Sequence, residues 1–129
     1  MAVFTQTITE TVAASGVGIS SSNTFSGDGR SGRSVTVPAS TNDHFVDLAI
    51  NVSEIQSIYM VSDQALTVET NSASVPDDTI VLIAGRPYIW SVNSYFANLF
   101  TTDVTALYLT NAVGTDAVFQ LEVVVDATP

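Results

Sequence analysis

Apolar and polar residues alternate in short runs from residue 44 onward. In Leu66–Thr70, for example, Leu66 and Val68 alternate with threonine and glutamate. A period of two residues is typical of β-strands that bury one face. The runs that predict strands are 44–51, 55–61, 66–70, 79–83, 88–92, 104–110 and 117–125.

The same alternation predicts which side chains form the core. We expect eight apolar residues to be mostly buried: Ile58, Met60, Leu82, Leu107, Leu109, Phe119, Leu121 and Val123. No window has a convincing helical period of 3.6 residues. The helical alternative is confined to a single turn at 94–100, where apolar residues recur at spacings of three and four.

The N-terminal third of the chain has a weaker pattern. Residues 2–12 alternate threonine with a broken apolar face, which predicts an edge strand or a strand that pairs with a neighbouring subunit. Residues 13–34 contain five of the seven glycines, a composition that predicts a loop around one short strand at 17–25. Another short strand is expected at 34–38, ending at Pro38. We expect the glycine-rich loop 26–34 to lie at the periphery and to be ordered mainly by neighbouring chains.

About eight to ten short strands with these turn spacings predict an all-β fold, either an antiparallel β-sandwich or a jelly-roll-like domain. We expect residues 1–129 to form a single domain, with residues 1–12 as an N-terminal arm that engages neighbours. Residues 55–63 resemble 104–112, and each segment precedes a turn and another strand. This similarity suggests two similar hairpins, with chance similarity among strands rich in valine and threonine as the alternative.

Composition narrows the functional classes. The chain has no Cys, no Lys, one His and three Arg against 13 acidic residues, for a net charge of -10. Most enzyme chemistry uses His, Cys or Lys, so we predict a non-enzymatic protein without a cofactor. Nucleic acid and anionic membranes are not expected partners, because both require clustered basic residues. With 46% hydrophobic and 12% charged residues, part of the apolar surface is expected to be covered by other subunits.

Few residues are candidates for catalysis or metal binding. His44 is the only imidazole, and we interpret it as a surface or interface residue because catalysis requires positioned partners. Asp77 and Asp78, with Asp63 and Asp103, are the candidates for a calcium site. The sequence lacks the D-x-D-x-D-G spacing, so we interpret these residues as turn formers and predict no metal.

The densest aromatic cluster lies at residues 88–100. Its members are Tyr88, Trp90, Tyr95, Phe96 and Phe100, which would either form core or anchor a protein interface. The cluster, the first strand and the glycine-rich segment supply the predicted protein-interface residues, which are Val3, Phe4, Thr5, Arg30, Arg33, Tyr95, Phe96 and Phe100.

Three stretches resemble a known class of protein: Ile58–Asn71, Ile80–Trp90 and Phe100–Asn111. Their strand and turn patterns are similar to those of head decoration (cement) or minor capsid proteins of tailed phages. The resemblance implies a homotrimeric virion protein that is made in the host cytoplasm. It would bind the major capsid protein on the outer surface of the head and stabilise the capsid lattice.

Two other functions remain open at this point. One is a carbohydrate-binding or receptor-binding β-sandwich module of a phage fibre or tail, which would present exposed aromatic side chains on a concave face. The other is a small hydrolase, which would require a cleft with paired carboxylates of perturbed pKa.

Overall fold

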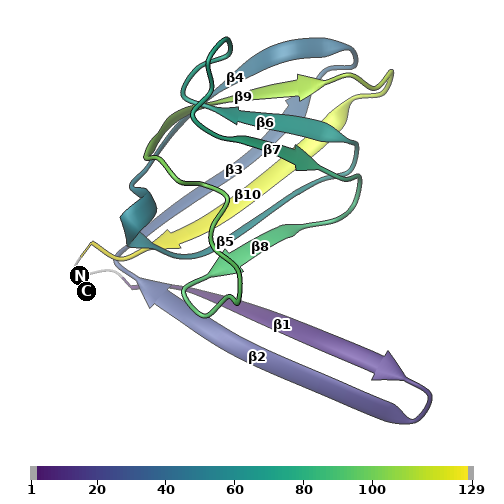
Figure 1. Cartoon of the computed structure of the whole chain (residues 1–129), viewed down its shortest axis with the longest axis vertical. Coiled ribbons are helices and arrows are strands. Elements are labelled where there is room, and N and C mark those ends of the chain that lie inside the picture. The colour runs from purple at the N-terminus through teal and green to yellow at the C-terminus, as the bar shows by residue number, and fades with distance from the viewer. Residues whose placement is uncertain (1–2, 128–129) are drawn as a thin grey trace.

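The computed structural model describes residues 3–127 and consists almost entirely of antiparallel β-structure (Figure 1). Two four-stranded sheets pack as a sandwich, and a two-stranded hairpin projects from one end. The prediction of an all-β, sandwich or jelly-roll-like fold is therefore confirmed. The strands are β1 (Phe4–Ala14), β2 (Val17–Gly27), β3 (Gly29–Val37), β4 (Thr41–Ile50), β5 (Ile55–Ser62), β6 (Leu66–Thr70), β7 (Thr79–Leu82), β8 (Tyr88–Ser91), β9 (Val104–Asn111) and β10 (Ala117–Val125).

The two sheets share one nested topology. Their strand orders are β3-β10-β5-β8 and β4-β9-β6-β7. Within them β3 pairs with β10, β4 with β9, β5 with β8 and β6 with β7, all antiparallel. The eight strands thus form one long ribbon that is folded across two sheets. This is the jelly-roll arrangement, which closes two Greek keys around one core.

The core lies between the two sheets, and all eight residues expected to be buried are buried there. Phe119, Leu121 and Val123 point inward from β10, and outward residues alternate with them. The inner face of β9 supplies Leu107 and Leu109. The period-two pattern predicted these positions because each of these strands has one face on the core.

The glycine-rich segment contains more strand than expected, because the short strands predicted at 17–25 and 34–38 are parts of longer ones. Residues 17–37 form two long strands, β2 and β3, and β3 pairs with β10 from Gly29 to Val37. The loop prediction for 26–34 is therefore wrong, and this segment is ordered by its own chain. Strands β2 and β3 have few buried side chains, so apolar and polar residues do not alternate along them. Without this alternation, the glycine-rich composition predicted a loop.

Two smaller expectations also need correction. Residues 94–100 contain no helical turn, and the short helix of the structure is a 3-10 turn at Val52–Glu54. The similar segments 55–63 and 104–112 do not begin hairpins, because β5 and β6 lie in different sheets, as do β9 and β10. Instead β5 pairs with β10 and β6 pairs with β9. The two similar segments therefore occupy equivalent places in the two sheets.

Candidate functional site

The hairpin β1–β2 is the most unusual feature of the molecule. Its strands pair over their full length, from Phe4 opposite Gly27 to Ala14 opposite Val17. A two-residue turn joins them, and Gly16 in this turn has a left-handed φ of 83° that glycine adopts without steric cost. Only Phe25 and Gly27 are buried in the two strands. Eleven residues per strand extend about 35 Å, so the hairpin projects well beyond the sandwich (Figure 1).

The base of the hairpin is fixed to the sandwich. Gly27 lies directly against the backbone of Val125 at the end of β10, where a Cβ atom would approach the Val125 carbonyl oxygen to 2.0 Å. The Ser57 hydroxyl on β5 donates a hydrogen bond to the side-chain oxygen of Gln6. These contacts, together with the burial of Phe25, set the direction in which the hairpin leaves the sandwich.

One face of the hairpin carries hydroxyl groups. Threonine occupies every second position of β1 from residue 5 to 11, and serine or threonine lies opposite each one on β2. Three hydroxyl pairs are hydrogen bonded across the strands, at distances of 2.8, 3.1 and 3.2 Å: Thr7–Thr24, Thr9–Ser22 and Thr11–Ser20. These hydroxyl groups partner one another and remain accessible to water, so the face needs no protein cover.

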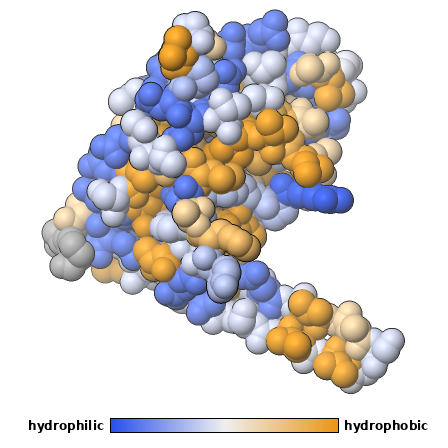
Figure 2. Space-filling view, in the orientation of Figure 1, coloured by the Kyte–Doolittle hydropathy of each residue, from blue (hydrophilic) through white to orange (hydrophobic). Residues whose placement is uncertain are grey.

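The opposite face ends in an apolar tip, formed by Val12, Ala14, Val17 and Ile19. Val12 and Val17 are each 64% exposed, and Ile19 is 67% exposed. Hydrophobic residues gather at the free end of the hairpin in Figure 2. Several large apolar side chains on one face of a projecting element indicate a surface that another molecule covers.

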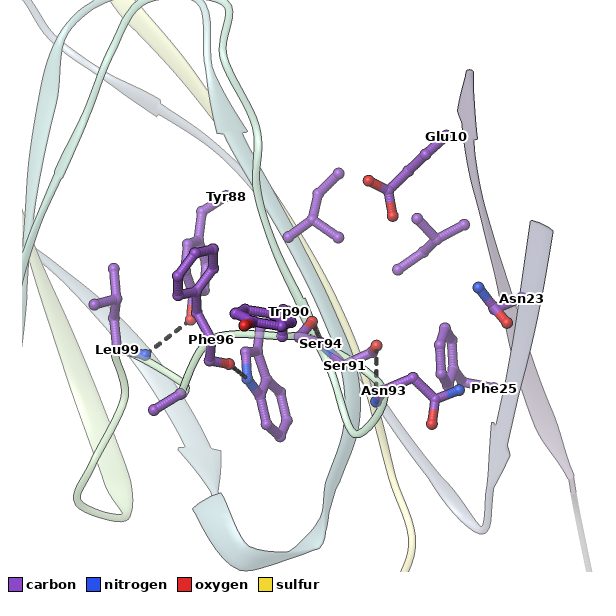
Figure 3. Close-up of a pocket in the computed structure, with 14 residues that line it drawn as sticks. Glu10, Asn23, Phe25, Tyr88, Trp90, Ser91, Asn93, Ser94, Phe96 and Leu99 are labelled. Carbon is purple, nitrogen blue, oxygen red and sulfur yellow. Dashed lines mark hydrogen bonds between the residues drawn. The ribbon is translucent and has the colours of Figure 1, made fainter. Parts of the chain in front are cut away.

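An aromatic cleft of about 530 Å³ lies between the same hairpin face and the segment 88–99 (Figure 3). The hairpin wall includes Ile8 and Phe25, with the polar groups of Glu10 and Asn23 beside them. On the sandwich side the cleft is lined by Tyr88, Ile89, Trp90, Ser91, Asn93, Ser94, Tyr95, Phe96, Ala97 and Leu99. Its volume lies within the usual range for binding sites.

Hydrogen bonds hold the irregular wall of the cleft against β8. The Tyr88 hydroxyl donates to Oδ1 of Asn98 at 2.5 Å and accepts the backbone N–H of Leu99 at 2.9 Å. The Trp90 indole donates to the carbonyl oxygen of Phe96 at 2.9 Å. These bonds keep the wall in place, with Tyr88 and Trp90 half-buried against the core. Tyr95 and Phe96 stack edge to face at 5.3 Å and point out of the sandwich.

Tyr88 gives the cleft wall a pH dependence. Burial raises the pKa of the Tyr88 hydroxyl above its ordinary value of 10.0, and the Leu99 N–H donor offsets part of the rise. The folded state therefore holds this proton more tightly than the unfolded chain, so stability is lost as pH rises above about 10. Between about pH 9 and 11, the free energy of unfolding measured with urea should therefore fall less steeply with pH for Tyr88→Phe than for the wild type. Equal slopes for the two proteins would contradict this prediction.

The predicted interface residues lie in three different environments. Val3, Phe4 and Thr5 are exposed at the base of the hairpin. Tyr95 and Phe96 are 95% and 78% exposed on the cleft wall. The structure therefore brings two groups of these residues to the hairpin and its cleft.

The other three predicted residues make contacts within the chain. Arg30 forms an exposed ion pair with Glu122 at 2.5 Å. Arg33 donates from Nε and Nη2 to the carbonyl oxygen of Asp47, which links β3 to β4 across the edges of the two sheets. Phe100 is only 4% exposed and packs in the core, so it is not available to a partner and must be withdrawn from the interface.

The apolar tip of the hairpin was not predicted from the sequence. Val17 and Ile19 fall in the short strand predicted at 17–25, but the glycines and serines around them gave no sign that this strand belongs to an exposed hairpin. The available signal was the charge pattern, because residues 11–27 contain no charged side chain.

The acidic candidates act as backbone acceptors in loops. Asp78 accepts hydrogen bonds from the backbone N–H groups of Thr101 and Thr102, and Asp63 accepts from that of Val118. Within residues 3–127, no three His, Asp or Glu side chains converge as a metal-binding group. His44 lies half-buried on β4.

Comparison of the chain with protein-family models, curated proteins and solved structures gives no significant match. Among the helices of residues 3–127, none has the length and apolar character needed to cross a membrane.

Proposed function

We propose that this chain is a non-enzymatic structural subunit of a larger assembly and that it attaches to its partners through the β1–β2 hairpin. The observation that carries the proposal is the exposure of a fully paired hairpin of 11-residue strands. A two-stranded hairpin is at best marginally stable in water when nothing packs on it. A long hairpin with an apolar tip is therefore best explained as an arm that other subunits cover.

The assembly that we propose is the head of a tailed phage. The stretches Ile58–Asn71, Ile80–Trp90 and Phe100–Asn111 resemble those of head decoration and minor capsid proteins. The jelly-roll fold supports this proposal, because viral capsid domains often use it. In this proposal the chain binds the major capsid protein on the outer surface of the virion, acts as a homotrimer and stabilises the lattice.

The second candidate is a carbohydrate-binding or receptor-binding module of a phage fibre or tail. The observation that favours it is the aromatic cleft, where exposed rings lie beside the polar side chains of Glu10, Asn23 and Asn93. Sugar rings stack on such aromatic faces. The jelly roll is equally compatible with this function, since lectin domains share it.

A shortened hairpin tests the assembly proposal. Ile8 pairs with Asn23, so replacing residues 9–22 with Asn-Gly should close the hairpin with a two-residue turn and remove the tip. We expect this variant to keep the β circular dichroism spectrum of the sandwich. We also expect it no longer to cosediment with phage heads, when it is added to heads that were assembled in the absence of this protein. Ser15→Asn is the matched control, because it places the same Asn-Gly turn on a full-length hairpin, and it should bind like the wild type.

Binding measurements separate the two candidate functions. A shortened variant that binds heads as tightly as the wild type would overturn attachment through the hairpin. If neither protein binds heads and the full-length chain binds glycans in a way that Phe96→Ala abolishes, the fibre or tail module becomes the correct function.

A further inference from the structure

We propose that the apolar tip of one copy docks into the aromatic cleft of a second copy, so that the chains join head to tail. This inference rests on the proposed function as an assembling subunit and names the partner of the hairpin. The inference has three requirements. The tip must lie out of reach of its own cleft, the cleft must present apolar surface, and the charges around both surfaces must permit two copies to meet.

The tip lies beyond the reach of its own sandwich. The hairpin residues that line the cleft are Ile8, Glu10, Asn23 and Phe25, and none of them lies beyond the pair formed by Glu10 and Ser21. Val17 pairs with Ala14, six residues beyond Ile8 on β1, which places it about 20 Å further along the hairpin. Figure 1 shows the free end pointing away from the sheets. The cover for Val12, Val17 and Ile19 must therefore come from another molecule.

The cleft offers apolar surface on two sides. Ile8 and Phe25 line it from the hairpin, and Trp90, Phe96 and Leu99 line it from the segment that follows β8 (Figure 3). Phe96 is 78% exposed and Leu99 is 53% exposed, so this surface is also uncovered. The apolar face of the tip can pack against this surface and leave the hydroxyl face in water.

The charge distribution selects a second copy as the occupant. The chain carries a net charge of -10, so two copies repel wherever charged surfaces meet. The two longest stretches without a charged residue are 11–27, which contains the tip, and 87–102, which contains the outer wall of the cleft. Apart from Glu10, which lines the cleft and lies beside the tip, these surfaces can meet without bringing like charges together. The residues that bound these stretches are Glu10, Asp28, Arg86 and Asp103, and Arg86 is the one that can attract Glu10 of another copy.

The contact proposed here is heterologous, because the tip and the cleft are different surfaces. Heterologous contacts close into rings when the rotation between copies permits it. In a closed ring of three copies, every tip would occupy a cleft and every cleft would hold a tip, which agrees with the proposed homotrimer.

Three single variants test the contact. We expect the wild type to form oligomers in sedimentation velocity, and we expect Val12→Asp in the tip and Phe96→Asp in the cleft to weaken association at least about tenfold. The matched control is Thr11→Asp, which adds the same charge at the neighbouring position on the hydroxyl face of the hairpin. It should associate like the wild type, because that face lies outside the contact.

Mixing the variants tests the head-to-tail arrangement. Val12→Asp retains an intact cleft and Phe96→Asp retains an intact tip, so an equimolar mixture should form one native junction and appear as a heterodimer in native mass spectrometry. A tip-to-tip contact would give no heterodimer, since one of the two tips is altered. Absence of the heterodimer, or an equal loss of association in Thr11→Asp, would overturn the inference.

The outcome also distinguishes this inference from the proposed function. A wild-type protein that stays monomeric at high concentration would overturn docking between copies, whereas the function as a head subunit would still stand if the monomer binds heads. If Val12→Asp then abolishes head binding, the tip docks on the capsid protein and not on a second copy.

Discussion

Replacing Leu121 with alanine is expected to lower the free energy of unfolding by about 2–5 kcal/mol. Leu121 is 1% exposed and lies on β10, which pairs with β3 on one side and β5 on the other. Strands on both sides hold the backbone, so the structure cannot collapse into the space that the side chain leaves. The loss therefore combines the transfer free energy of the deleted atoms with the cost of a cavity. Urea unfolding monitored by circular dichroism would measure it.

The control for this substitution is the next residue toward the N-terminus. Gln120 is exposed on the outer face of the same strand, so Gln120→Ala should change stability by no more than about 0.5 kcal/mol. Similar losses for the two variants would show that the strand itself, and not the packing of its inner face, determines the effect.

Gly27→Ala is expected to destabilise the protein by about 3 kcal/mol or more, although it adds one methyl group. The new Cβ would lie 2.0 Å from the carbonyl oxygen and 2.7 Å from the carbonyl carbon of Val125. Backbone atoms at the end of a central strand cannot rotate away as a flexible side chain can, so the base of the hairpin must shift. This places the cost at the upper end of the range for overpacking. Hydrogen exchange should show loss of protection at Phe25 and Gly27, and thermal unfolding should occur at a lower temperature.

A second glycine in the same strand provides the comparison. A Cβ on Gly18 would have its nearest neighbour, the carbonyl oxygen of Val12, at 4.0 Å. Gly18→Ala should therefore leave stability within about 0.5 kcal/mol of the wild type. If Gly27→Ala is equally well tolerated, the hairpin does not rest on β10 as the structure shows.

The fold could be predicted from the sequence wherever one face of a strand packs on the core. The predicted bounds of the strands at 66–70 and 117–125 match β6 and β10 at both ends. Turn residues bracket each of these strands, and apolar residues recur at every second position along them. Leu107 and Phe119 were assigned to the core by the same pattern, because burial of one face imposes the period of two.

The hairpin and the cleft could not be predicted in the same way. Strand β2 has exposed side chains on both faces along most of its length, so no burial pattern marks it in the sequence. The aromatic residues of 88–100 have similar compositional signals, yet Phe100 enters the core and Phe96 remains outside. The direction of a side chain in an irregular segment depends on tertiary hydrogen bonds, such as that from Trp90 to the Phe96 carbonyl oxygen.

The nested ribbon has a consequence for folding kinetics. Strand β10 lies between β3 and β5, and Gly29 pairs with Val125 near opposite ends of the sequence. The first sheet can therefore close only after residues 117–125 have joined it, and until then the facing edges of β3 and β5 stay unpaired. Forming such non-local pairs first requires closure of long loops, which slows all-β sandwiches to the millisecond-to-second range. The hairpin β1–β2 pairs residues at most 23 positions apart in the sequence and can form in about 1–10 μs. The arm can therefore acquire its structure before β10 joins the sandwich.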